Sequence, residues 1–309
     1  MAENPPNPSP SKAVVFVRRT ASTLLLWAIV GGALASGKAP VYLGLICALA
    51  LLSTLEYFRM LREAGVQCYP RLGLVVSTVY CAAIFYFFQN GAKAIPADLD
   101  LAMIVISVTA AFTLQLRFPV YGSDSLLSVA ANLLGFVYIA FLFNFATRLA
   151  LFDFPVSYLA TLPQGWNEVP GAFLLLWLLA VTKFTDMGAY ITGSAIGKHK
   201  MIPHISPGKT WEGFVGALFF SQLAACGLYA LLPLKILGGW HHVIILGFII
   251  ALLAVIGDLA ESIVKRALGA KDSGRMLPGI GGALDLIDSI CFTAPALYFY
   301  LKWVLLPAA

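Results

Sequence analysis

Charged residues are scarce in this chain. They make up only 11% of its 309 residues, whereas 60% of the residues are hydrophobic. A soluble domain has about a quarter of its residues charged. The deficit excludes an ordinary water-soluble enzyme and any disordered or collagen-like chain. We expect an all-α, polytopic membrane protein, whose solvent is mostly lipid.

Several signatures of soluble enzymes and metal sites are also missing. The five cysteines lie far apart without a CxxC pair. This spacing favours buried apolar side chains over a disulfide framework or a zinc site. Neither a GxxxxGK[ST] loop nor a GxGxxG fingerprint occurs, which argues against P-loop NTPases and Rossmann proteins. The net charge of +5 comes without an arginine-rich stripe, so no nucleic-acid partner is expected.

Hydrophobic runs of about 20 residues, long enough to cross a bilayer, recur along the chain. The expected spans, about nine in all, are near 20–37, 40–57, 72–89, 99–116, 126–147, 171–193, 211–233, 241–262 and 287–306. Residues 1–12 are predicted to form a disordered tail, and 150–170 a longer loop. We divide the rest into N-terminal spans over 13–170 and a C-terminal catalytic region over 171–309.

Lysine and arginine are unevenly distributed between the two sides that these spans define. With the N-terminus in the cytosol, most of the 20 cations fall in cytosolic segments. The positive-inside rule therefore predicts a multi-pass protein of the inner (plasma) membrane in this orientation. The two most polar loops, 194–210 and 263–286, then share the cytosolic face, where they can form one site.

Carboxylates gather in or at the ends of the C-terminal spans, where a charge costs about 3 kcal/mol on insertion scales. A helical salt bridge could explain one of them, but not the whole set. Asp258, Glu261, Ser262 and Lys265 have the spacing i, i+3, i+4, i+7, which is one face of a helix. Carboxylates at helix ends beside hydroxyl groups suit a hard cation such as Mg²⁺.

Two more polar stripes accompany this face. Lys183, Asp186 and Tyr190 are spaced i, i+3, i+7, and Asp285 and Asp288 are spaced i, i+3. The two polar loops interleave lysine and arginine with glycine, whose backbone N–H groups can approach an anion closely. Cations and glycines beside carboxylates are typical of a site for Mg²⁺ and a polyphosphate.

The residues of these loops resemble the signature of the phosphatidate cytidylyltransferases (CDP-diacylglycerol synthases). Residues 262–288 read SIVKRALGAKDSGRMLPGIGGALDLID, against the family pattern S-x-x-K-R-x(4)-K-D and then P-G-H-G-G-x-x-D-R-x-D. The segments TDMGAY at 185–190, GKHK at 197–200 and SPGKTWEG at 206–213 also match. Three positions depart from the pattern: Ile280 replaces the histidine, Leu286 the arginine, and Ser194 an arginine common after the glycine.

This resemblance implies that CTP and phosphatidate react to give CDP-diacylglycerol and pyrophosphate in the membrane, with one or two Mg²⁺ ions. The catalytic candidates are Asp258, Lys265, Arg266, Lys271 and Asp285. The substrate-binding candidates are Asp186, Tyr190, Lys198, Ser206, Lys209, Thr210, Trp211, Ser262, Asp272, Gly281 and Gly282. The metal candidates are Asp258, Glu261, Asp285 and Asp288. A homodimer stays an open alternative to a monomer.

Three other functions are alternatives to this transferase. A CTP-dependent polyprenol or phytol kinase would use the same nucleotide but release CDP. The departures at Ile280 and Leu286 leave an inactive paralogue open. A transporter or channel is disfavoured, because the acids cluster at the cytosolic helix ends rather than along the membrane midplane.

Overall fold

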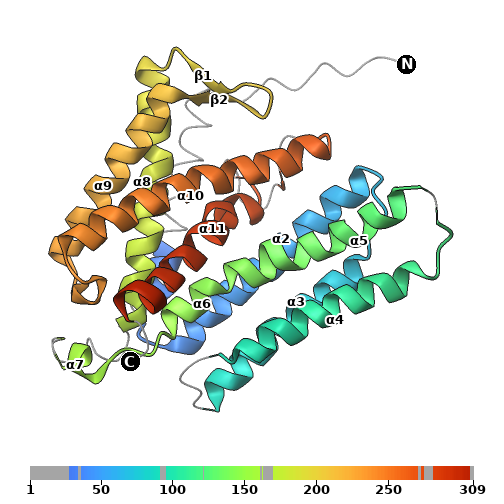
Figure 1. The fold of residues 1–309 in the computed structure, drawn as a ribbon, viewed down its shortest axis with the longest axis horizontal. Helices are drawn as coiled ribbons and strands as arrows, with labels where there is room; N and C mark the ends of the chain where they lie inside the picture. Colours follow the sequence, from blue (N-terminus) through green and yellow to red (C-terminus); the bar gives the residue numbers. More distant parts are fainter. Residues whose placement is uncertain are drawn as a thin grey trace, which may run out of the picture.

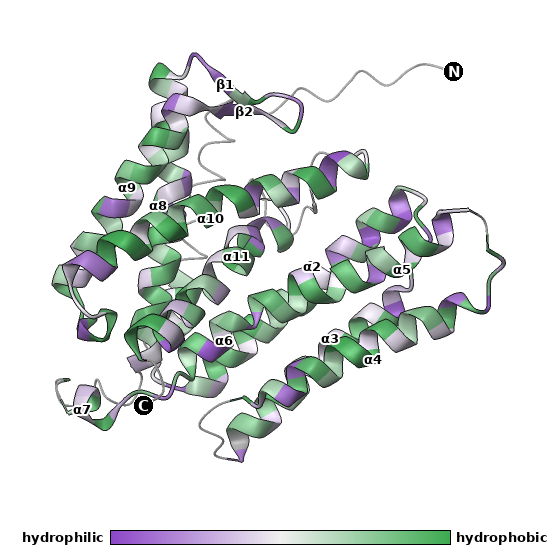
Figure 2. Ribbon diagram, in the orientation of Figure 1, coloured by the Kyte–Doolittle hydropathy of each residue, from purple (hydrophilic) through white to green (hydrophobic). Residues whose placement is uncertain are grey.

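The computed structural model describes residues 28–33, 36–90, 95–120, 122–160, 162, 170–270, 273–274 and 281–306. Across these ranges the chain is almost entirely helical (Figure 1). The only sheet in the described ranges is the antiparallel hairpin of β1 (Lys200–Ile202) and β2 (Ser206–Thr210). The helices are largely hydrophobic along their length, whereas the hairpin mixes hydrophilic with hydrophobic residues (Figure 2).

Eight helices of the described chain are long and apolar enough to cross a membrane. They are α2 (Ala39–Glu63), α3 (Pro70–Gln89), α4 (Ala97–Gln115), a helix over Asp124–Ala150, α8 (Pro170–Ile196), α9 (Trp211–Leu231), α10 (Trp240–Ala267) and a helix over Leu284–Leu305. The fourth consists of α5 (Asp124–Leu134), a π-helical stretch (Gly135–Phe141) and α6 (Phe145–Ala150), and the last of α11 (Leu284–Tyr300) and a π-helical end (Leu301–Leu305). Two short elements, α7 (Val156–Leu159) and a 3₁₀ turn (Lys235–Leu237), lie in connections.

The predicted fold class is confirmed: this is an all-α, multi-pass membrane protein. Each predicted span from 40–57 onward corresponds to one of the eight helices. The span predicted near 20–37 falls mostly outside the described residues, although 28–33 are helical, and the tail at 1–12 lies wholly outside them. No span occupies the described part of 150–170, which contains only α7.

One continuous hydrophobic core joins the helices before and after residue 170. Its fully buried members include Tyr57 on α2, Leu149 on α6, Trp177 on α8 and Leu297 on α11. Helix α11 lies between α10 and α2, and thus connects the two groups of helices (Figure 1). The division of the chain at residue 170 stays a prediction about roles, since both groups share this core.

Glycine residues allow α8 and α9 to approach each other closely. A Cβ atom at Gly216 of α9 would overlap the Thr192 hydroxyl and lie 2.8 Å from the Gly188 carbonyl oxygen of α8. A Cβ atom at Gly188 would lie 2.6 Å from that of Phe220. In lipid no hydrophobic effect drives helices together, so membrane helices use small residues at such crossings to gain close packing contacts. This tight pair carries the β1–β2 hairpin at one end.

We expect Gly216→Ala to lower the thermal stability of the detergent-solubilised protein, whereas Gly227→Ala in the same helix should not. The first substitution overpacks the α8–α9 contact, at a cost of about 1–3 kcal/mol. A Cβ atom at Gly227 meets nothing within 4 Å, and alanine has a higher helix propensity than glycine. The Gly227→Ala substitution should therefore leave the stability unchanged or raise it slightly. Melting curves of the two variants measure this difference, and equal melting temperatures would contradict it.

Candidate active site

Helices α10 and α11 touch backbone to backbone at Gly257. A Cβ atom there would lie 2.7 Å from the Cα atom of Ser289 and 2.9 Å from the carbonyl oxygen of Asp288. The Ser289 hydroxyl donates a hydrogen bond of 3.2 Å to the Ala254 carbonyl oxygen across the same contact. Because the backbones meet here, the acids next to Gly257 on α10 face the acids at the start of α11.

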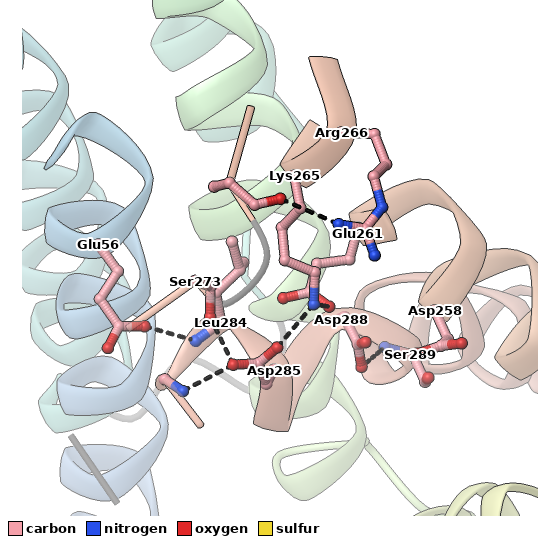
Figure 3. A network of polar contacts seen from close by, with 12 residues as sticks. Glu56, Asp258, Glu261, Lys265, Arg266, Ser273, Leu284, Asp285, Asp288 and Ser289 are labelled. Atoms are coloured by element: carbon pink, nitrogen blue, oxygen red, sulfur yellow. Dashed lines mark hydrogen bonds and ion pairs between the residues drawn. The ribbon is translucent and has the colours of Figure 1, made fainter. Parts of the chain in front are cut away.

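This crossing assembles an acid cluster, which we define as Asp258, Glu261 and Asp288 (Figure 3). One carboxylate oxygen from each lies within 4.8 Å of the others. Glu261 and Asp288 are buried, and the Oε1 atom of Glu261 has no hydrogen-bond partner in the described part of the chain. Buried carboxylates this close repel one another unless a cation compensates them. Their all-oxygen donors and the unpartnered Oε1 atom fit a hard divalent cation such as Mg²⁺.

Lys265 joins this cluster to Asp285. Its ammonium group lies 2.6 Å from Glu261 Oε2 and 2.9 Å from Asp285 Oδ1. The other oxygen of Asp285 accepts hydrogen bonds of 2.6 Å from the Ser273 hydroxyl and from the Gly282 backbone N–H. Asp285 was predicted as a metal ligand. Here both of its oxygens have protein partners, and it lies outside the acid cluster.

The hairpin is fastened to α10 by a second lysine. The Lys209 ammonium group on β2 lies 2.5 Å from Asp258 Oδ2 and also donates to the Val255 carbonyl oxygen at 3.3 Å. At the base of the hairpin, Thr210 caps α9 by accepting a hydrogen bond of 3.1 Å from the Gly213 N–H. These contacts hold a cation of the hairpin against the acid cluster.

A cavity of about 550 Å³ opens beside the cluster, with walls from α8, the hairpin, α9, α10 and α11. Of the predicted site residues, it is lined by Asp186, Tyr190, Ser206, Lys209, Thr210, Asp258, Asp285 and Asp288. Segments about 100 residues apart in sequence therefore place acidic and basic side chains in one cavity. Lys183, one turn from Asp186 along α8, lies 3.6 Å from its carboxylate.

Other predicted site residues have different surroundings. Lys198, Trp211, Ser262 and Arg266 are not among the lining residues, and Trp211 is 53% exposed. The Arg266 guanidinium donates to the carbonyl oxygens of Ile205 and Ala270, at 3.4 and 3.3 Å, and so links the hairpin turn to the end of α10. Gly281 has a φ of +127°, which favours glycine, and Gly282 donates to Asp285. Lys271 and Asp272 lie outside the described residues.

One departure from the family pattern has a structural explanation. Leu286, which stands where the pattern has arginine, is buried and packs in the main hydrophobic core. Its side chain does not line the cavity. In this chain the position therefore serves packing, and the cations next to the acids come from Lys209 and Lys265. Ile280, the second departure, lies outside the described residues.

Glu56 on α2 is a site residue that the sequence analysis missed. Its Oε2 atom accepts a hydrogen bond of 3.0 Å from the Leu284 N–H at the start of α11, 228 residues away (Figure 3). A Cβ atom at Gly274 or at Gly282 would overlap the Glu56 carboxylate. Glu56 thus caps the helix that carries Asp285 and Asp288. The available signal was an isolated acid at the end of a hydrophobic span.

Comparison with known proteins gives the family. Residues 17–304 match the model of the Cytidylyltransferase family, and the chain belongs to this family. It is 39% identical over 148 residues to Uncharacterized protein YnbB of Escherichia coli K12, covering 48% of each chain. It is 37% identical over 201 residues to a Phosphatidate cytidylyltransferase of Staphylococcus aureus (strain COL), covering 64% of this chain and 66% of that protein.

A third relative is a Phosphatidate cytidylyltransferase of Brucella suis, 43% identical over 134 residues, with 43% of this chain and 48% of the relative matched. The matched segments thus span about half to two thirds of these relatives' lengths. The family resemblance drawn from the two loops is confirmed.

We expect Glu56→Leu to destabilise the protein by about 1–3 kcal/mol, because it leaves the Leu284 N–H without its partner. Glu56→Gln keeps one side-chain acceptor, so it should lower the free energy of unfolding clearly less than Glu56→Leu does. Thermal unfolding of the two variants in the same detergent measures the difference. A Glu56→Leu variant as stable as Glu56→Gln would show that the cap does not hold α11 in place.

Proposed function

We propose that this protein transfers the cytidylyl group of CTP to phosphatidate, giving CDP-diacylglycerol and pyrophosphate. The observation that carries the proposal is the acid cluster beside Lys209 and Lys265, two of whose carboxylates, Asp258 and Asp288, line a cavity in a membrane protein. Such an arrangement suits a cation and a polyphosphate. Membership of the cytidylyltransferase family supports the reaction class, and two relatives named Phosphatidate cytidylyltransferase support the substrates.

We further propose that the cavity faces the cytosol from the inner (plasma) membrane. The hairpin, the residues that lead into it and the last turn of α10 contain Lys198, Lys200, Lys209, Lys265 and Arg266, and cations accumulate on cytoplasmic faces. CTP would reach such a site from the cytosol. Phosphatidate would stay in the leaflet, with its phosphate at the height of the helix ends and its acyl chains in lipid.

The proposed reaction needs no covalent intermediate on the protein. A phosphate oxygen of phosphatidate attacks the α-phosphorus of CTP, a new P–O bond forms, and the bond to the β-phosphate oxygen breaks as pyrophosphate leaves. The attacking phosphate is already an anion at neutral pH, so a strong general base is not required. The replacement of the family histidine by Ile280 is therefore compatible with turnover. The site would therefore act by positioning the two substrates and neutralising the charge on their phosphates.

Each group near the cavity has a proposed part in this work. Asp258, Glu261 and Asp288 would hold Mg²⁺, which supplies charge neutralisation at the phosphate oxygens. Lys209, which pairs with Asp258, and Lys265, which pairs with Glu261 and Asp285, would also contact phosphate oxygens. Ser206 and Thr210 offer hydroxyl donors from the hairpin side. Trp211, half exposed, suits an anchor at the membrane interface.

The direct test supplies purified protein in detergent with phosphatidate, Mg²⁺ and CTP labelled at the α-phosphate. We expect the label to move into a lipid while pyrophosphate is released in equal amount. With a polyprenol also present, label found in free CDP would indicate a lipid kinase instead. Label that stays in CTP would contradict transferase activity and favour an inactive paralogue or a transporter.

Replacing Asp258 by asparagine should lower CTP turnover by at least about a hundred-fold, because one charged oxygen ligand is lost from the acid cluster. The Mg²⁺ concentration that gives half-maximal activity should rise in parallel. Asp124→Asn, which changes an exposed acid at the start of α5, is the matched control and should behave like the wild type. An Asp258→Asn variant with normal turnover and Mg²⁺ dependence would remove Asp258 from the metal site.

A further inference from the structure

A second hollow lies between α2 and α3, apart from the active-site cavity. It has a volume of about 660 Å³, and its lining includes Leu52, Leu55, Glu56, Arg62, Arg71 and Leu74. We call it the α2–α3 groove. It lies where α2 ends and α3 begins, so it is at a membrane boundary. Apart from Glu56, none of its lining residues belongs to the candidate active site.

Both carboxylates of the α2–α3 groove already have protein partners. Glu63 lies 2.8 Å from the Nε atom of Arg59, one helical turn away. Glu56 accepts the Leu284 N–H at the start of α11. In the described part of the chain, neither Arg62 nor Arg71 has an ion pair, and both are exposed. The groove therefore offers two guanidinium groups and no free carboxylate.

The rest of the groove is apolar. Leu52 and Leu55 on α2 and Leu74 on α3 line it, and Leu55 is 47% exposed. Arginine binds phosphate oxygens through paired, planar donors, which a compact lysine ammonium cannot match. A ligand that satisfies both parts must carry a phosphate at one end and hydrocarbon at the other, and it must be present at a membrane boundary.

We propose that the α2–α3 groove binds an anionic phospholipid. Its phosphate group contacts Arg62 and Arg71, and an acyl chain lies along Leu52, Leu55 and Leu74. The positive-inside rule explains cations on this face in general. It does not explain two unpaired arginines beside leucines in a groove whose carboxylates, Glu63 and Glu56, are engaged by Arg59 and by the Leu284 N–H. Because Glu56 lines the groove and also caps α11, the bound lipid packs against a residue that holds the candidate active site.

The test is lipid retention by the full-length protein, measured by native mass spectrometry in detergent. Phosphatidylglycerol is the probe, since it carries the charged phosphodiester and is not a substrate of the proposed transfer. Phosphatidylcholine with the same acyl chains is the neutral comparison. The wild type should retain phosphatidylglycerol in preference. Arg71→Gln should weaken its apparent affinity about five-fold, and Arg62→Gln/Arg71→Gln should abolish the preference.

Arg117→Gln provides the matched control, because it removes one exposed arginine between α4 and α5, outside the groove. It should leave phosphatidylglycerol binding unchanged. An equal loss in Arg71→Gln and Arg117→Gln would overturn the proposal in favour of diffuse surface attraction. Absence of any preference in the wild type would also overturn it. Retention of phosphatidate with exclusion of phosphatidylglycerol would replace it with a substrate site. Lipid binding is compared only among variants whose melting temperatures equal that of the wild type, so that misfolding is not mistaken for lost binding.

Discussion

The backbone contact of α10 and α11 at Gly257 is the constraint on which the rest of the site depends. Only a residue without a side chain lets the two helices meet where Ser289 and the Asp288 carbonyl oxygen fill the space beside it. The acids one and four residues along α10 then face Asp288, so three carboxylates from two helices share one small volume. Bringing these carboxylates together costs free energy through repulsion and desolvation. Membrane proteins keep such groups where they pair with other charges or bind an ion or ligand.

The surrounding structure supports this crossing from three directions. Lys265 pairs with Glu261 of the cluster from within α10 and also contacts Asp285, which accepts hydrogen bonds from Ser273 and Gly282. Lys209 approaches from the hairpin, which the tight α8–α9 pair presents to α10. Glu56 fixes the start of α11 from α2, so the N-terminal helices take part in the site through one carboxylate. Asp285 itself accepts from three donors, the Lys265 ammonium group, the Ser273 hydroxyl and the Gly282 N–H.

The sequence predicted the spans well because a bilayer demands long apolar helices and little else fits the composition. It also placed Asp258, Glu261 and Lys265 on one face, since helical spacing fixes that relation within α10. It did not find Glu56, because a contact across 228 residues depends on tertiary packing that no local pattern contains. Nor does a local pattern contain the contacts of Asp285 with Lys265, Ser273 and Gly282. The expectation that Asp285 ligates a metal stays a prediction.

We propose that the acid cluster of α10 and α11 binds a divalent cation. Anomalous diffraction from crystals soaked in Mn²⁺, a substitute for Mg²⁺ with a measurable signal, tests this binding. We expect a peak within coordination distance of Asp258, Glu261 and Asp288. A peak held by Asp285 without these three, or no peak in this region at saturating Mn²⁺, would contradict it.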